Sequence, residues 1–135
     1  MKARKSPQWI PPSDLDKECL ELCVAMNKLP GIRTTNSCCG HGDQPERTGF
    51  TPHAFWIFFA VDDPECLLPL LYWMQTCHSE VKGKWHVEVY TDCAGDKVFW
   101  MLEGPVGAQA YEDARVIAQK LEGIANIRRL ERKRK

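Results

Sequence analysis

The chain has 135 residues, of which 44% are hydrophobic and 27% charged, and it contains five Trp. This length and composition are typical of one globular domain with a packed core, and they exclude a fibrous or largely disordered protein. The longest unbroken apolar run, residues 54–61, is far too short to cross a bilayer. We therefore expect a protein that makes no use of a membrane.

Charge is unevenly distributed along the chain, although the formal net charge is zero. Lys2, Arg4 and Lys5 give the first five residues a charge of +3, and residues 128–135 carry +5, which leaves −8 on residues 6–127. An acidic body repels phosphate backbones, so any contact with nucleic acid is expected through the basic termini. A solvated helix end is the simpler interpretation of the last eight residues, because positive charge suits the end of a helix dipole.

Seven cysteines occur at irregular spacing, and no secretory signal is present. The basic first residues are followed by Pro7, Pro11 and Pro12, where a signal peptide would need an apolar segment. We expect reduced thiols and a cytoplasmic location in the producing or host cell. The sequence leaves open whether the chain forms a homo-oligomer.

The first half of the chain reads as a tether, a helix, a strand and a loop. Residues 1–12 are basic and proline-rich, which predicts a flexible N-terminal segment. Ser13 is the expected N-cap of a first helix, whose apolar residues recur at helical spacing until Pro30-Gly31. Residues 32–38 are then expected to form a strand, and residues 40–53, rich in glycine, proline and charge, a long loop.

The second half repeats this alternation. The apolar residues 54–61 predict a central strand, and Asp63-Pro64 supplies a cap and a first-turn proline for a second helix that reaches about Ser79. Residues 85–91 and 98–102 alternate in polarity around a Gly95-Asp96 turn, which indicates an antiparallel hairpin that ends at Gly104-Pro105.

A long third helix is expected after the hairpin. The predicted order αββαββα indicates an α+β fold, a two-layer sandwich of about four mainly antiparallel strands with three helices on one face. We expect residues 13–127 to form this single domain, with residues 128–135 as a basic C-terminal tail.

The segment Ser37-Cys38-Cys39-Gly40-His41-Gly42 is the strongest candidate for a functional site. Thiolates and imidazoles bind soft metals, and they also serve as nucleophile and base. Three interpretations are open. The first is a zinc site, with Cys38, Cys39, His41 and His53 as candidate ligands and Cys93 or His86 as further ones.

The second interpretation is nucleophilic catalysis. Cys38 or Cys39 would be the nucleophile and His41 its base, oriented by Asn36 or His86. The catalytic candidates on this interpretation are Cys38, Cys39 and His41.

The third interpretation is a pocket for a polar or anionic ligand. Gly40 and Gly42 would expose backbone N–H groups to that ligand, while aromatic side chains such as Trp56 and Trp100 stack on it. Most of the aromatic residues are nevertheless expected in the core and in the hairpin. The expected ligand-binding residues are Asn36, Ser37, Gly40, Gly42, His53, His86 and Trp100.

The run Leu29-Pro30-Gly31-Ile32, Thr34-Thr35 and Ser37 to Gly42, followed by an aromatic strand, resembles small phage and prophage proteins that mostly have no assigned function. The resemblance spans about residues 22–61 and implies a compact accessory protein, of the kind that binds a host protein or a small signalling nucleotide.

A fainter resemblance is to the wybutosine-synthesising tRNA methyltransferase family. Its Thr-Ser-Ser-Cys-Ser-Gly-Arg segment also lies between a first helix and an aromatic strand. Here His41 stands at the arginine position and the chain is shorter, so that family's activity and cofactor are not carried over.

The sequence therefore favours a phage-type accessory protein with a polar ligand-binding loop site at Cys38–His41, whose ligand is a nucleotide-like small molecule. The alternative is a zinc-dependent or cysteine-dependent enzyme that acts on a nucleotide or RNA substrate.

Overall fold

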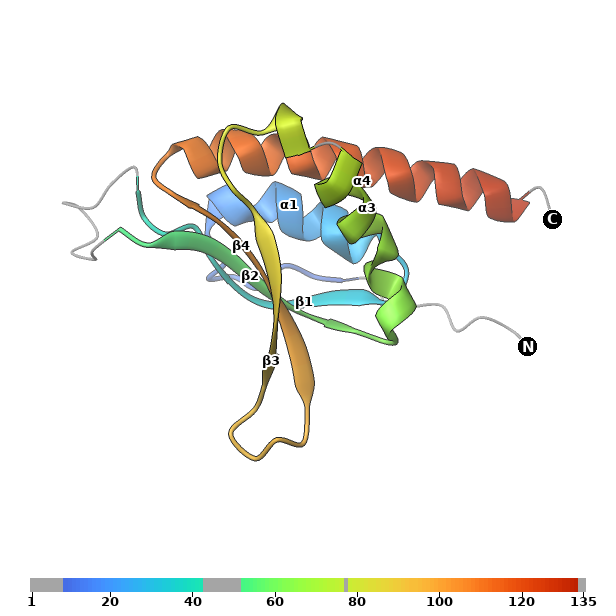
Figure 1. The fold of residues 1–135 in the computed structure, drawn as a ribbon, viewed down its shortest axis with the longest axis horizontal. Coiled ribbons are helices and arrows are strands. Elements are labelled where there is room, and N and C mark those ends of the chain that lie inside the picture. Colours follow the sequence, from blue (N-terminus) through green and yellow to red (C-terminus); the bar gives the residue numbers. More distant parts are fainter. Residues whose placement is uncertain (1–8, 43–51, 77, 134–135) are drawn as a thin grey trace.

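The structure, a computed structural model, describes residues 9–42, 52–76 and 78–133, with side chains as far as residue 127. It confirms the predicted α+β fold. A four-stranded antiparallel sheet has the strand order β1-β2-β4-β3, and the helices cover one of its faces (Figure 1). Within the described residues, no helix is both long and apolar enough to cross a membrane.

The helices and strands follow the predicted order. In chain order they are α1 (Lys17–Asn27), β1 (Ile32–Cys38), β2 (Ala54–Val61), η1 (Pro64–Leu67), α3 (Leu68–Thr76), η2 (His78–Glu80), β3 (His86–Thr91), β4 (Val98–Val106) and α4 (Gln109–Lys133). The two η elements are short 3-10 helices.

Helix α1 begins later than predicted. Asp16 occupies the N-cap position instead of Ser13, and its side chain makes no capping bond. Its Oδ2 accepts a hydrogen bond from the backbone N–H of Cys39 at 3.0 Å, so the start of α1 is tied to the end of β1. The helix ends at Asn27, before the predicted Pro30-Gly31, and the Asn27 side chain bonds both Cys23 O and Thr34.

Two further boundaries differ from the prediction. Asp63 caps as expected, but it caps the 3-10 helix η1, and α3 follows without interruption. Strand β4 continues through Gly104-Pro105 to Val106, because its last residues pair with Ala54 of β2. Helix α4 continues to Lys133, so the backbone is helical across most of residues 128–135, which agrees with their interpretation as a helix end.

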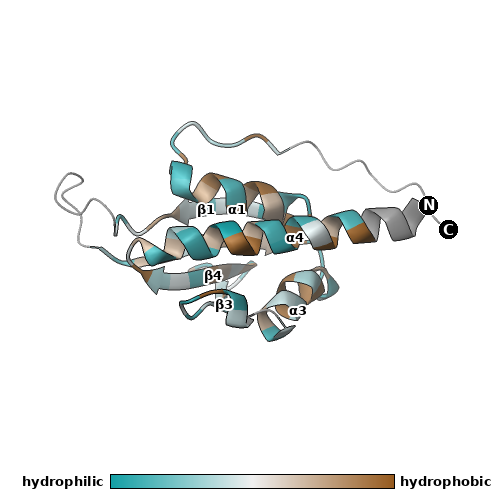
Figure 2. Cartoon of the chain, turned by 90° about the horizontal axis from the view of Figure 1, so that it is seen from above, coloured by the Kyte–Doolittle hydropathy of each residue, from teal (hydrophilic) through white to brown (hydrophobic). Residues whose placement is uncertain are grey.

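The core lies between the sheet and the helices. Phe55, Ile57 and Phe59 of the central strand β2 are fully buried against apolar residues of α1 and α4. Figure 2 shows α1 and α4 side by side above the sheet, with apolar and polar residues interleaved along α4. Leu102 and the half-buried Trp100 belong to the same packed layer, on the helix side of the sheet.

None of the helices in the described part of the chain covers the opposite face of the sheet (Figure 1). We call it the open face. The register places Cys38, Trp56, Glu103 and His86 opposite one another in one row across all four strands. Trp56, Phe58, Tyr90 and Phe99 contact one another on this face, with ring centroids 5.0–5.9 Å apart. The polar residues Cys38, Glu103 and His86 therefore share one row of the sheet with Trp56.

Asp113 joins the segment before β3 to helix α4. It is 2% exposed, and its carboxylate accepts hydrogen bonds from Lys82 N, Gly83 N and Trp85 Nε1 at 2.9–3.0 Å. Burial raises the pKa of Asp113, but the hydrogen bonds donated by Trp85, Lys82, Gly83 and Gln109 lower it by more, so the net pKa is below 3.8. The ionised carboxylate thus holds the start of the hairpin against α4.

Candidate metal centre

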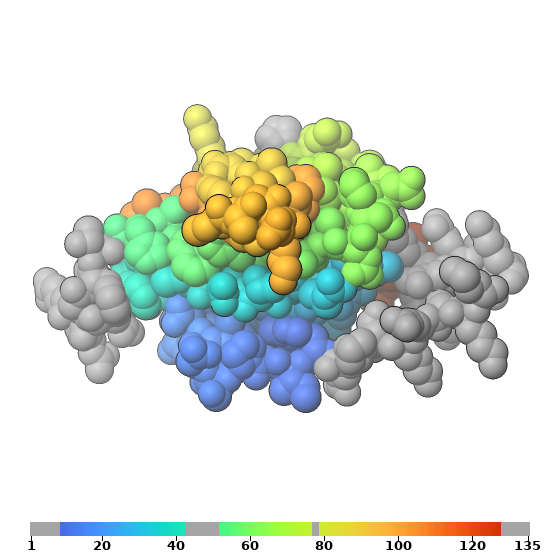
Figure 3. Space-filling model, turned by 90° about the horizontal axis from the view of Figure 1, so that it is seen from below, coloured from blue at the N-terminus to red at the C-terminus, as the bar shows by residue number. Residues whose placement is uncertain are grey.

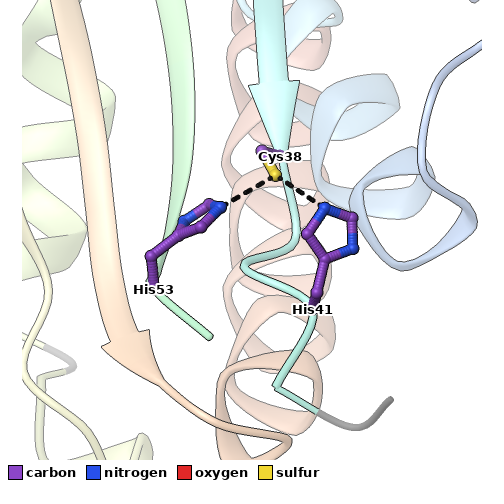
Figure 4. A group of neighbouring side chains, drawn as sticks. All are labelled: Cys38, His41 and His53. Atoms are coloured by element: carbon purple, nitrogen blue, oxygen red, sulfur yellow. Dashed lines mark hydrogen bonds between the residues drawn. The ribbon is translucent and has the colours of Figure 1, made fainter. Parts of the chain in front are cut away.

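Cys38, the last residue of β1, lies between two histidines. Its Sγ is 3.5 Å from His41 Nε2 and 3.5 Å from His53 Nε2 (Figure 4). The three ligand atoms all lie within 4.8 Å of one another. Two of the histidines expected at the site are therefore brought to one thiol, from opposite sides.

The backbone after β1 turns sharply to return His41 to Cys38. Gly40 has a φ of +82° and His41 a φ of +56°, so two consecutive residues are left-handed. For a residue other than glycine this conformation costs on the order of 1 kcal/mol, and such strain concentrates at functional sites. The turn places the His41 ring beside the Cys38 thiol rather than out in solvent.

His53 reaches the same thiol from the start of β2. Its backbone N–H donates to Gly40 O at 3.0 Å, which closes the loop between the two histidines. Its Nδ1 is 2.8 Å from Ala54 O, so Nδ1 carries the proton and Nε2 presents its lone pair toward Cys38 Sγ. A backbone carbonyl that fixes the tautomer in this way is the usual partner of a metal-binding histidine.

The two glycines of the motif allow close backbone contacts inside the protein. A Cβ at Gly40 would lie 2.1 Å from His53 O, and one at Gly42 would lie 2.4 Å from the Cα of Gly107. Gly42 therefore packs on the junction between β4 and α4. Both glycines serve to close and anchor the loop, a role that the sequence interpretation did not assign to them.

Cys39 points away from Cys38, into the core. It is buried, and the His41 backbone N–H donates to its Sγ at 3.4 Å. Asp16, Cys39 and His41 form a second group whose ligand atoms lie within 4.8 Å of one another. The two thiols thus lie against different nitrogens of the His41 ring, with Cys39 Sγ 3.8 Å from Nδ1 and Cys38 Sγ 3.5 Å from Nε2.

Burial disfavours the thiolate form of both cysteines. Burial raises the pKa of Cys39 to about 11, although the His41 N–H opposes this, and burial also raises the pKa of Cys38. Both cysteines are therefore protonated at neutral pH in the absence of a metal. A reactive cysteine needs a lowered pKa, so this geometry argues against the nucleophile interpretation.

The two sulfur–nitrogen distances suit a tetrahedral metal ion. Zinc binds cysteine sulfur at about 2.3 Å and imidazole nitrogen at about 2.0–2.1 Å, which puts sulfur and nitrogen about 3.5 Å apart on a tetrahedron. Cys38 Sγ lies 3.5 Å from each imidazole nitrogen. Three protein ligands leave the fourth position open, as in zinc sites that bind a water or a substrate.

Other predicted site residues lie elsewhere. His86 is on β3, three strands from Cys38 or about 14 Å across the sheet. Its Nε2 is 2.8 Å from Glu88 Oε1 and 3.4 Å from Glu103 Oε1, so it belongs to an exposed ionic group. Trp100 faces the helices, and Cys93 is exposed in the β3–β4 turn.

Asn36 and Ser37 lie on either side of β1. Asn36 pairs with Phe58 and shares the open face with Cys38, whereas Ser37 pairs with the buried Ile57 on the helix side. Asn36 therefore remains close to the metal centre.

Sequence reasoning missed a groove beside this centre. The groove has a volume of about 310 Å³ and lies between β1 and the N-terminal segment, with Trp9 and Trp56 among its lining residues. Trp9 packs against the core, and residues 1–8 of the N-terminal segment that was expected to be flexible lie outside the described residues. No periodicity marks Trp9 in a proline-rich segment, so only the folded chain shows this contact.

Comparisons with known proteins found no relative: no family model matches the chain, and no curated protein or solved structure matches it.

Proposed function

We propose that this chain is a zinc-dependent ligand-binding protein. Cys38, His41 and His53 hold the metal, and its open position takes an oxygen or nitrogen of a small, nucleotide-like ligand. The observation that carries the proposal is the position of Cys38 Sγ, which lies 3.5 Å from the Nε2 atoms of both histidines.

Two features of the chain favour a metal over a solitary cysteine–histidine contact. His41 adopts a left-handed conformation that returns its ring to Cys38, and His53 has its tautomer fixed by Ala54 O. The first feature brings the His41 ring to Cys38, and the second turns the Nε2 lone pair of His53 toward the same thiol, so a metal ion beside Cys38 would have both imidazoles within reach. Soft thiolate with imidazole is a donor set that zinc binds well.

We favour ligand binding over catalytic turnover as the function of this site. A hydrolytic zinc site usually has a carboxylate positioned to handle the proton of the metal-bound water. Among the described residues, the group formed by Cys38, His41 and His53 itself contains no carboxylate, and the neighbouring Asp16, which lies within 4.8 Å of a His41 ring nitrogen, is engaged with the Cys39 N–H. The open coordination position is, however, the feature that favours the second candidate function, a zinc enzyme that acts on a nucleotide or RNA substrate.

Titration with Co²⁺ tests the metal site directly. We expect the purified metal-free chain to bind one Co²⁺ with the intense thiolate absorption of a tetrahedral site, and Zn²⁺ to displace it. Cys38→Ser should abolish the thiolate band. His53→Ala should weaken affinity by on the order of 100-fold, at least as much as the loss of an outer partner of a metal ligand.

His86→Ala is the matched control, because His86 is a histidine in the other cluster of ligating side chains on the open face. It should leave the Co²⁺ spectrum and affinity unchanged. If His53→Ala and His86→Ala behave alike, or if the thiolate band survives in Cys38→Ser, the proposed ligand set is wrong.

The resemblance to phage and prophage proteins remains a prediction, separate from the proposed zinc site.

A further inference from the structure

The groove beside the metal centre is lined by both aromatic and polar residues. Trp9 comes from the N-terminal segment and Trp56 from β2, and both indoles are half-buried. Figure 3 shows the N-terminal part of the chain (blue) lying directly along β1 (cyan). Asp14, Thr35, Asn36 and Ser37 are polar residues of the same lining.

Two indoles beside one groove favour a planar ring as the occupant. Stacking on an aromatic side chain is tolerant of ring identity and is worth about 1–3 kcal/mol for a nucleobase. The Asn36 side chain offers both a donor and an acceptor, which is the combination that reads the edge of a base. Asp14 supplies an acceptor of the kind that binds ribose hydroxyls.

The edge of β1 argues against an extended peptide in this groove. β1 is an outer strand of the sheet, so its outward backbone groups would otherwise invite a further strand. The Asn27 side chain accepts the Thr34 N–H, and Asp16 accepts the Cys39 N–H. Both ends of the strand edge are therefore occupied by the protein itself, and only the short stretch between them faces the groove.

The groove leads to the metal centre. Trp56 lines the groove and is the direct cross-strand partner of Cys38. Asn36 lies on the same face as Cys38, two residues away and so about 7 Å along the strand. A ligand in the groove thus lies beside Trp56, one cross-strand pair from Cys38.

From these contacts we infer that the groove and the metal centre together bind a nucleoside 5′-phosphate. The base stacks between Trp9 and Trp56, the ribose lies near Asp14, and a phosphate oxygen takes the open position on the metal. This inference rests on the proposed zinc site, which supplies the positive charge that the acidic surroundings lack.

Calorimetric titration of the zinc-loaded chain with four ribonucleoside monophosphates (AMP, GMP, CMP and UMP) tests the inference, with inorganic phosphate as the reference ligand. At least one nucleotide should bind ten-fold or more tightly than phosphate. Trp9→Ala should bring nucleotide affinity close to that of phosphate, because phosphate binding does not use the groove. Zinc content should stay unchanged in this variant.

Tyr72→Ala is the control, since Tyr72 is an exposed aromatic residue on α3, outside the groove. It should bind nucleotides like the unaltered chain. Normal zinc content with no nucleotide preferred over phosphate, or with equal affinity in Trp9→Ala, would overturn this inference and leave the zinc site standing. If the unaltered chain does not bind zinc, the proposed function itself is wrong.

Discussion

Replacing Gly40 with alanine is expected to lower the free energy of unfolding by about 3 kcal/mol or more, a large effect for one methyl group. The new Cβ would lie 2.1 Å from the His53 carbonyl oxygen, and the φ of +82° disfavours any side chain. Because the Gly40–His53 pair also sets the position of the His53 ring, the variant should lose metal affinity as well. Chemical denaturation and Co²⁺ titration measure the two effects.

Gly95→Ala is the matched control for this substitution. Gly95 has a similar φ of +71° in the β3–β4 turn, but nothing lies within 4 Å of the position that a methyl group would take there. The variant should therefore lose only the cost of a left-handed alanine, about 1 kcal/mol, and bind Co²⁺ normally. Equal losses in the two variants would show that backbone conformation alone, and not the contact with His53, requires glycine at position 40.

Replacing Asp113 with alanine is expected to lower the free energy of unfolding by about 3 kcal/mol. The substitution leaves the N–H groups of Lys82, Gly83 and Trp85 without the carboxylate that they share in the buried joint between the hairpin and α4. Glu112→Ala, at the exposed neighbouring position of the same helix, should change stability by no more than about 0.5 kcal/mol.

The pH dependence of stability provides an independent check on Asp113. The pKa of Asp113 in the folded protein is below its ordinary value of 3.8. The ionised carboxylate therefore contributes its full stabilisation above pH 3.8. This contribution is lost as the pH falls through the pKa of the folded state. The unaltered chain should therefore lose more stability between about pH 5 and pH 2 than Asp113→Ala. Parallel acid profiles for the two proteins would contradict the assignment of a lowered pKa to this residue.

The fold could be predicted because its strands and helices have clear periods. The apolar run 54–61 became the central strand β2, and the alternation around Gly95 became the β3–β4 hairpin. The errors occur where a distant partner decides a boundary. The Asp16 side chain accepts the Cys39 N–H instead of capping α1. Strand β4 extends past Pro105 because Ala54 pairs with Val106. Such partners are separated widely in sequence, so local pattern does not reveal them.

The candidate site was predictable in its residue types and less so in its geometry. Successive residues of a strand point to opposite faces, and the structure accordingly places only Cys38 with both histidines, while Cys39 belongs to the core. What the pattern could not show is which histidine returns to the thiol. His53 does so through the Gly40 backbone pair, whereas the sheet register carries His86 to the far edge.

X-ray absorption at the zinc edge, on the zinc-loaded chain, is the most direct measurement of the proposed centre. We expect one sulfur at about 2.3 Å and two imidazole nitrogens at about 2.0–2.1 Å, with one further light atom that changes when a ligand is added. Cys39→Ser should give the same spectrum, since the Cys39 thiol is buried beneath His41. A shell of two or more sulfurs, or a spectrum without sulfur, would contradict the Cys38–His41–His53 site.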